Sequence, residues 1–179
     1  MCAMLDGKSM DTSMGFSALE GLPMSTRSGA IDPDVLLFLM KVKKYSATEL
    51  ETLLYKKSGL LGISGISGDM RVLMDSKAPS AAEAIDYLVY QIVKFAGAYT
   101  AVLGGLDAFV FTAGIGENDA PLRAAVVEKL AWLGAKLDVA ANDRNEARIS
   151  TADSKVSVWV IPTNEELMIA QHTAALAGV

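Results

Sequence analysis

The pattern of apolar and polar positions predicts an alternation of helices and strands along the chain. Across residues 80–103, apolar side chains recur at the i, i+3, i+4 and i+7 spacing of a long, mostly buried helix. Shorter helices are predicted to begin at Asp32-Pro33 and at Ser46, where capping residues precede apolar stripes. The runs at 108–111 and 156–161 are apolar and rich in β-formers, which predicts two buried strands.

The first 34 residues predict a β-hairpin followed by a long loop. Residues 1–13 look like two short strands joined at Asp6-Gly7, a favoured hairpin turn. Residues 14–34 lack periodicity and are rich in glycine, proline and serine, as long functional loops often are. The full order of elements predicts an α/β layer sandwich, a mixed sheet flanked by helices. With 179 residues, of which 51% are hydrophobic, we expect a single domain over residues 1–179.

Segment 107–118, DAFVFTAGIGEN, is the central candidate for a ligand site. A strand, a glycine turn and a helix in succession bring backbone N–H groups and a helix N-terminus to one place. The turn is therefore either a nucleotide or anion site or a tight connection without a ligand. The dinucleotide fingerprint needs a third glycine, and Asp119 occupies its place. We expect Asn118 to cap a helix over residues 119–133.

Two charged positions outside this turn are further candidates. Arg27 is the only cation of the 14–34 loop, and it is either a solvated side chain or a ligand for phosphate or carboxylate. The pair Asp69 and Arg71 follows the glycine-rich run at 59–68, which is predicted to be a loop that ends in a helix cap.

The last predicted helix begins with two adjacent glutamates. Thr163 and Glu166 have the spacing of a capping box, which leaves Glu165 without a capping role. Glu165 then either complements the helix dipole or reaches a bound metal, usually through water as magnesium prefers.

Composition excludes several classes of function. The net charge is −5 and no basic block occurs, so nucleic acid is not an expected partner. A single cysteine and a single histidine exclude a Cys/His metal site. Charges interrupt the most apolar stretch before it reaches bilayer length, and no signal peptide opens the chain. We therefore expect no membrane partner and a cytoplasmic location.

Four segments together resemble the acetate kinases, of the acetate and sugar kinase, Hsp70 and actin superfamily. The matching motifs are DTSMGFSALEG, STRSGAIDP, FTAGIGEN and PTNEEL, at residues 11–21, 25–33, 111–118 and 162–167. SGISGDMR, which ends at Arg71, resembles the family's adenosine-contacting segment more loosely. The resemblance implies the actin-like ATPase fold, a ribonuclease H-like layer sandwich.

The same resemblance implies a reaction and a role for each candidate residue. The reaction is phosphoryl transfer between ATP and acetate, which gives acetyl phosphate and ADP. Arg27 would stabilise the transferring group, and Glu165 would position Mg²⁺. Such a transfer depends mainly on placement and on cancelling charge, so it needs no protein nucleophile. The residues implied for adenosine are Asp69, Met70 and Arg71, and those for the rest of the nucleotide are Gly114, Ile115, Gly116, Glu117 and Asn118.

Two departures from the family pattern affect these expectations. Ser25 stands where the family usually has glycine before Thr26-Arg27. Family members are also much longer, and their first half supplies the acyl-substrate pocket and further active-site residues. We therefore expect this chain to be the C-terminal, nucleotide-binding half, inactive without its N-terminal domain. The family's C-terminal halves form its dimer, so a homodimer is expected here.

Three alternatives remain open at this point. The related propionate kinases share the motifs, so the chain is alternatively half of a propionate kinase. It is alternatively a non-catalytic module that binds nucleotide and self-associates through its long apolar helix. A dinucleotide-binding oxidoreductase is suggested by Gly114 and Gly116, although the carboxylates of Glu117 and Asp119 argue against a pyrophosphate at this turn.

Overall fold

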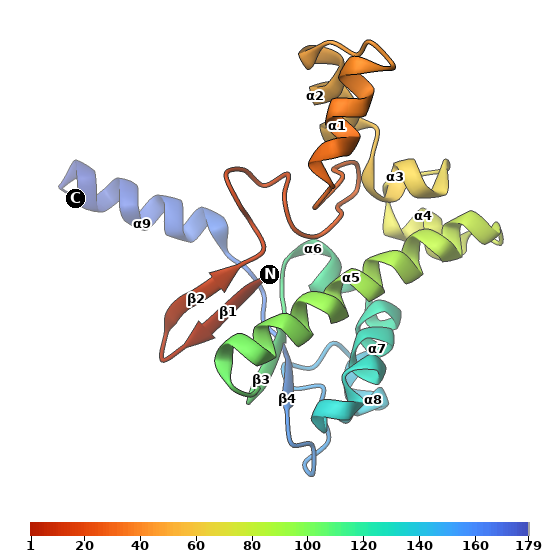
Figure 1. The fold of residues 1–179 in the computed structure, drawn as a ribbon. Helices are drawn as coiled ribbons and strands as arrows, with labels where there is room; N and C mark the ends of the chain where they lie inside the picture. Colours follow the sequence, from red (N-terminus) through yellow and green to blue (C-terminus); the bar gives the residue numbers. More distant parts are fainter. Residues whose placement is uncertain (179) are drawn as a thin grey trace. The chain divides into compact units, whose positions relative to one another are not determined.

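The computed structural model describes residues 1–178, apart from the side chain of Glu165. The chain falls into two compact units, Met1–Leu106 and Asp107–Val179, and each is described by itself. In the described residues, each unit contains one two-stranded sheet together with its helices (Figure 1). The single domain expected from the length of the chain stays a prediction.

The first unit begins with the predicted hairpin. Strands β1 (Cys2–Leu5) and β2 (Lys8–Thr12) pair antiparallel. The turn residues Asp6 and Gly7 have φ values of 50° and 74°, as a type I′ turn requires. The hairpin prediction is therefore confirmed.

Helix α5 (Pro79–Leu103) is the longest element of the first unit and confirms the predicted long helix. It begins with Pro79 in its first turn and ends at Gly104, whose φ of 72° closes the helix in a left-handed conformation. One face packs against the hairpin and the two short helices that precede α5. The buried side chains of that face are Ala81, Ala84, Leu88, Val89, Ile92, Ala96 and Tyr99.

Four shorter helices lie between the hairpin and α5. The predicted starts of α1 (Pro33–Lys41) and α2 (Ala47–Lys56) are confirmed, the second by a complete capping box at Ser46. Helix α3 (Gly59–Ser64) lies within the run that was predicted to be a loop, so that prediction is wrong. Helix α4 (Met70–Asp75) follows it.

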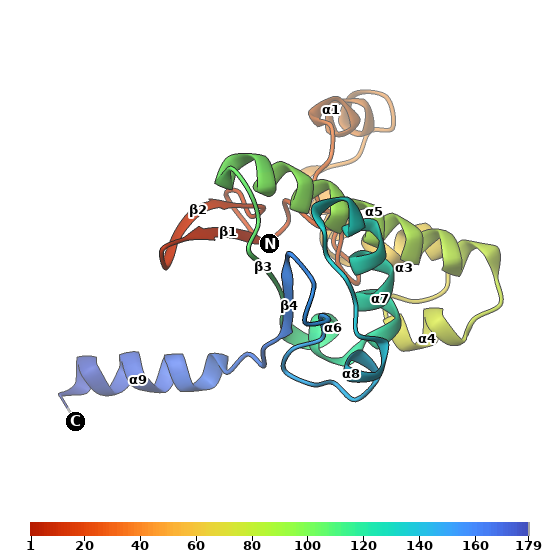
Figure 2. The ribbon, with the colours of Figure 1, turned by 90° about the horizontal axis from the view of Figure 1, so that it is seen from below.

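The second unit is built on two parallel strands. Strands β3 (Ala108–Phe111) and β4 (Ser157–Val160) pair in register from Ala108↔Ser157 to Phe111↔Val160. Helices α7 (Ala120–Lys129) and α8 (Val139–Asp143) lie beside this pair, and α9 (Glu165–Ala177) runs away from it (Figure 2). The buried core of the unit includes Leu122, Val126, Val127, Leu130, Ile149 and Val158.

The glycine turn after β3 differs from its prediction. Residues Ala113–Asn118 form a short helix, α6, and not an extended loop. The cap of the next helix is Asp119, whose Oδ1 accepts the Leu122 N–H at 2.9 Å, so the prediction for Asn118 is wrong. Because α6 curls the chain into a helical turn, the capping position moves one residue further on. Helix α7 ends at Lys129, and a 3-10 turn (Ala131–Leu133) completes the predicted 119–133 helix.

Candidate functional site

The predicted site residues belong to both units. Arg27 and the Asp69–Arg71 segment are in the first unit, and the glycine turn and Glu165 are in the second. Within the second unit the structure brings the glycine turn and the segment before α9 together.

The loop that carries Arg27 caps helix α3 with its own backbone. The carbonyls of Met24 and Ser25 accept the N–H groups of Leu60 and Leu61, both at 3.0 Å. The first N–H groups of a helix have no partner within the helix, so these bonds satisfy donors that would otherwise be unpaired. The loop itself is closed by the Met24 N–H, which donates to the Arg27 carbonyl at 3.1 Å.

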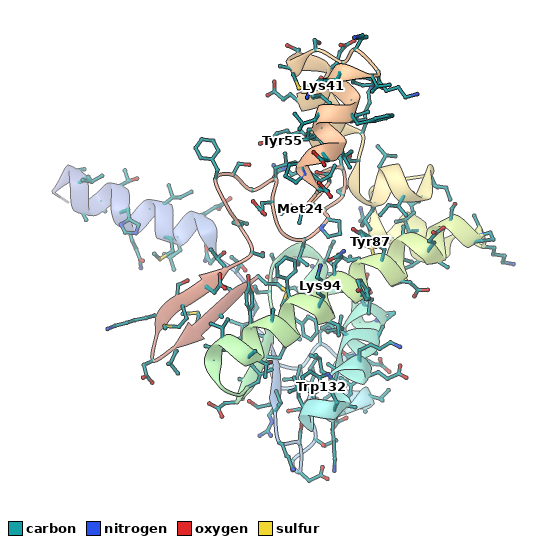
Figure 3. All side chains as sticks on the ribbon, viewed as in Figure 1. Met24, Lys41, Tyr55, Tyr87, Lys94 and Trp132 are labelled. Atoms are coloured by element: carbon teal, nitrogen blue, oxygen red, sulfur yellow. The ribbon has the colours of Figure 1, made fainter. Side chains whose placement is uncertain are left out.

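The Arg27 side chain is held by weak contacts. Its Nη1 lies 3.9 Å from the Met24 sulfur, and its guanidinium lies 5.8 Å from the ring centre of Tyr55 (Met24 and Tyr55 are labelled in Figure 3). Such cation–π contacts are modest at accessible sites. In the described residues Arg27 makes no ion pair. Its charge is therefore not neutralised by a carboxylate of the described chain.

The Asp69–Arg71 segment combines a helix cap with an ion pair. The Asp69 carboxylate accepts the Arg71 N–H at 2.9 Å and caps α4. It also accepts two guanidinium N–H groups of Arg71, from Nε at 3.1 Å and Nη2 at 2.6 Å. The guanidinium bonds, together with the backbone bond, hold the pKa of Asp69 below its usual value. The Arg71 side chain is exposed, whereas Met70 between the pair is buried in the core.

The glycine turn joins β3 to α6 through an unusual backbone conformation. Ala113 has a φ of 60°, which few residues other than glycine adopt. Next to it, a Cβ at Gly114 would meet nothing within 4 Å, so this face of the turn is open. A Cβ at Gly116 would lie 3.3 Å from the Phe111 carbonyl carbon, so that face packs closely on β3. Gly114 is therefore the part of the turn with space for a ligand beside it.

Thr163 ties the glycine turn to the end of β4. Its Oγ1 hydrogen-bonds Thr112 Oγ1 and accepts the Ala113 N–H at 3.2 Å. Its own N–H donates to Glu117 Oε1 at 2.9 Å. These bonds occur because parallel strands end at the same edge of the sheet, where open α/β sheets bind ligands. The glycine turn and the segment before α9 therefore meet at this edge of the sheet.

The predicted capping box at Thr163 and Glu166 is wrong. Asn164 is the cap of α9, and its Oδ1 accepts the Leu167 N–H at 2.9 Å. Thr163 is not available as a cap because its hydroxyl contacts the glycine turn. The Glu165 side chain, predicted to serve a metal, lies outside the described part of the structure.

Sequence reasoning missed Arg123, which supports the glycine turn through hydrogen bonds to its backbone carbonyls. This α7 side chain is 0% exposed, and all five of its guanidinium N–H groups are used. Nη1 donates to the carbonyls of Gly116 and Glu117 at 3.0 and 2.9 Å, at the end of α6. Nε and Nη2 donate to the side chain and carbonyl of Asn142, and Nη2 also donates to Asn145 Oδ1.

Burial of the Arg123 guanidinium disfavours its charged form. Desolvation lowers the pKa of Arg123, while Asp119 and Asp143 oppose that shift. A signal for the residue existed in the sequence. Arg123 lies three and four residues before the buried Val126 and Val127, on the apolar face of its helix.

No cluster of three or more histidine, cysteine, aspartate or glutamate side chains suited to a metal occurs among the described residues. Glu117 does place a carboxylate against the segment that carries Glu165, through its bond to the Thr163 N–H. Carboxylate oxygens are the donors that Mg²⁺ prefers, and one or two of them suffice when substrate phosphates and water complete the shell. Among the described residues, this edge supplies one carboxylate, Glu117, of the kind that Mg²⁺ prefers. Over the same described residues, no helix combines the length and hydropathy needed to cross a bilayer.

Comparison with solved structures defines the class to which this fold and site belong. A Porphyromonas gingivalis acetate kinase superposes with a TM-score of 0.91 at 41% identity, over 98% of this chain and 46% of that one. A Francisella tularensis propionate kinase superposes with a TM-score of 0.89 at 44% identity, over 95% and 44% of the two chains. The fold is therefore the actin-like ATPase fold of these kinases, as the resemblance implied.

The sequence comparisons identify the family. The model of the acetokinase family matches residues 1–171. The acetate kinase of Rhodopseudomonas palustris is 55% identical over 179 residues, 99% of this chain and 45% of that protein. The chain belongs to the acetokinase family. It spans somewhat less than half the length of the curated relatives that it matches.

Proposed function

We propose that this chain is the C-terminal, nucleotide-binding half of an acetate kinase, which transfers a phosphoryl group between ATP and acetate. The observation that carries the proposal is the 55% identity to an acetate kinase over 99% of this chain. The chain covers 45% of that relative, in keeping with one half of a longer enzyme. A cytoplasmic location belongs to the same proposal.

In this proposal Arg27 acts on the transferring phosphoryl group. Its guanidinium forms no ion pair within the described residues, so its charge is open to an anionic substrate. Phosphoryl transfer places negative charge on three equatorial oxygens, and a planar arginine fork can donate to two of them. Arg27 would bind these oxygens and cancel charge that develops between donor and acceptor.

The residues proposed for nucleotide binding form two groups, one within each unit. Asp69 and Arg71 present polar groups for the adenosine, and Met70 would contribute its backbone because its side chain is buried. Residues 114–118 would hold the remainder of the nucleotide. The support is the open side of Gly114 and the bracing of the turn by Thr163 and Arg123.

Glu165 would position Mg²⁺ through water at the end of β4. The support is its place directly after the Thr163 and Asn164 segment, which contacts the glycine turn. The metal, when bound, would neutralise phosphate charge. The protein's part would be to supply the Glu165 carboxylate, and the Glu117 carboxylate, which accepts the Thr163 N–H, lies against the same segment.

A propionate kinase is the second candidate for the longer enzyme. The similarity to a solved propionate kinase, at 44% identity and a TM-score of 0.89, favours it specifically. We propose acetate as the acceptor because curated relatives at 49–55% identity over nearly all of this chain include the acetate kinases of Rhodopseudomonas palustris and Rickettsia prowazekii.

Purified 179-residue protein is expected to bind ADP and ATP but to form no acetyl phosphate. The physical reason is that Arg27 and one metal supply only part of the charge cancellation that phosphoryl transfer needs. Titration calorimetry with ADP, ATP and NAD measures the first expectation. Trapping of acetyl phosphate as its hydroxamate, with ATP, Mg²⁺ and acetate present, measures the second.

The controls separate the alternatives. Binding of NAD in preference to ADP would favour an oxidoreductase and contradict the proposal. Robust turnover by the chain alone would contradict its assignment as an inactive half.

We propose further that the chain forms a homodimer, and α1 offers the surface for it. None of the nine residues of α1 is buried in the described structure. The exposed apolar side chains around it are Val35, Leu37, Phe38, Met40 and Val42. Exposed apolar residues on an unburied helix are candidates for an interaction surface.

Leu37→Glu is therefore expected to convert a dimer into a monomer, because it places a charge in the apolar surface that would be buried. Sedimentation velocity at micromolar concentration measures the change. Val139→Glu is the matched control, since Val139 is an exposed apolar residue of α8 in the other unit. A wild-type protein that sediments as a monomer would contradict the proposal.

A further inference from the structure

Ser25 forms a side-chain hydrogen bond that links the Arg27 loop to the Asp69–Arg71 segment. Its Oγ donates to the Gly68 carbonyl at 2.6 Å, although the two residues are 43 positions apart in the sequence. Among the described residues, no other hydrogen bond joins the 24–28 loop to residues 65–71. The bond depends on the residue at position 25, because glycine or alanine there has no hydroxyl.

The close approach of the two segments depends on Gly68. A Cβ at this position would lie 2.4 Å from Ser25 Oγ and 2.6 Å from the Ser25 carbonyl oxygen. Only glycine leaves room for the loop to reach the backbone here. Gly68 is therefore placed so that its carbonyl meets the Ser25 hydroxyl.

Both ends of this bond are anchored to the rest of the first unit. On one side, the Ser25 carbonyl accepts the Leu61 N–H at 3.0 Å, and the Thr26 Oγ1 donates to the Tyr55 carbonyl at 2.8 Å. On the other side, Ser64 Oγ, in α3, donates to the Ser67 carbonyl at 3.1 Å and accepts the Ser67 N–H at 3.3 Å. The hydrogen bond therefore joins two segments that are each held to the rest of the first unit.

We propose that Ser25 is a positioning residue that keeps the Arg27 loop and the adenosine segment in one relative geometry. The proposal rests on the proposed function, which gives Arg27 the phosphoryl group and Asp69–Arg71 the adenosine. Arg27 lies two residues after Ser25, and Asp69 directly follows Gly68. The bond thus sets the distance between the groups that would hold the two ends of one nucleotide.

Ser25→Ala tests the proposal because it removes the hydroxyl and little else. In the 179-residue chain it is expected to raise the hydrogen–deuterium exchange of the backbone at both 24–28 and 67–71. The dissociation constant for ADP is expected to rise roughly two- to tenfold, the worth of one hydrogen bond. Ser25→Thr keeps a hydroxyl and is expected to restore both values.

Ser28→Ala is the matched control. Ser28 lies in the same loop, and its Oγ donates to the neighbouring Gly29 carbonyl at 3.0 Å, which makes no link to Gly68. It is expected to leave exchange at 67–71 and ADP binding unchanged. If Ser25→Ala leaves exchange at 67–71 unchanged, or if Ser28→Ala has the same effect on ADP binding, the proposal is overturned.

The failure of the proposed function gives a different result. A wild-type chain that does not bind ADP would overturn the nucleotide site and, with it, the role of Ser25 in positioning that site. The exchange comparison between Ser25→Ala and Ser28→Ala would still decide whether the hydroxyl links the two segments.

Discussion

Replacing Arg123 with methionine is expected to lower the free energy of unfolding by roughly 3–5 kcal/mol, because each buried acceptor left without a donor costs about 1–3 kcal/mol. The methionine side chain fills much of the same volume but donates no hydrogen bond. The carbonyls of Gly116, Glu117 and Asn142 and the side-chain oxygens of Asn142 and Asn145 would lose a charged donor. Each buried acceptor left unpaired costs free energy. Urea unfolding followed by circular dichroism measures the change.

Arg144→Met provides the control for the Arg123 substitution. Arg144 is exposed and pairs with Glu146 at 2.8 Å on the surface. Surface ion pairs contribute about 0–1 kcal/mol, so this variant is expected to unfold close to the wild type. Arg123→Lys keeps the charge but has only three donors, and its stability is expected to lie between those of the two methionine variants. Equal stability of the Arg123 and Arg144 variants would sink this account of the network.

Replacing Gly59 with alanine is expected to destabilise the first unit by roughly 2–5 kcal/mol, from left-handed strain and overpacking together. Gly59 has a φ of 59° at the start of α3. Its Cβ would lie 2.1 Å from the Met24 carbonyl oxygen and 2.6 Å from that of Arg27. These atoms cannot move freely, because Met24 caps α3 and Arg27 closes the loop. Thermal and urea unfolding measure the loss.

The other end of α3 offers a control with the same backbone conformation. Gly65 has a φ of 64°, and a Cβ there would meet nothing within 4 Å. Gly65→Ala is therefore expected to cost only about 1 kcal/mol, the left-handed strain partly offset by the lower entropy of the unfolded chain. If the two alanine variants are equally stable, the contact between Gly59 and the Arg27 loop has no energetic importance.

Much of the secondary structure was predictable because it depends on near neighbours. The 25-residue helix α5 follows from apolar spacing, and the start of α2 follows from Ser46 and Glu49, three residues apart. The Asp6-Gly7 turn likewise follows from residues that tolerate a positive φ. In each case the decisive residues lie within a few positions of one another.

Two of the wrong predictions concern residues that form hydrogen bonds with groups distant in the sequence. Thr163 and Glu166 have capping-box spacing, but the Thr163 hydroxyl contacts Thr112, 51 residues away. Asn164 therefore caps the helix. The glycine-rich run at 59–68 was predicted to be a loop, yet it contains α3 because carbonyls of the 24–25 backbone satisfy the first N–H groups of that helix.

The sequence by itself determined the alternation of helices and strands, the α/β class and, through four motifs, the family of this chain. These conclusions rest on local periodicity and on residue types at set spacings, which a linear sequence contains. Only the tertiary structure decided what Arg123, Ser25, Gly59 and Thr163 do. Arg123 bonds to Asn142, which is 19 residues away in the sequence. Ser25 bonds to Gly68 at a separation of 43 residues, and Thr163 bonds to Thr112 at a separation of 51. Such pairs form only when the packing of helices and strands closes the intervening chain, so no local pattern specifies them.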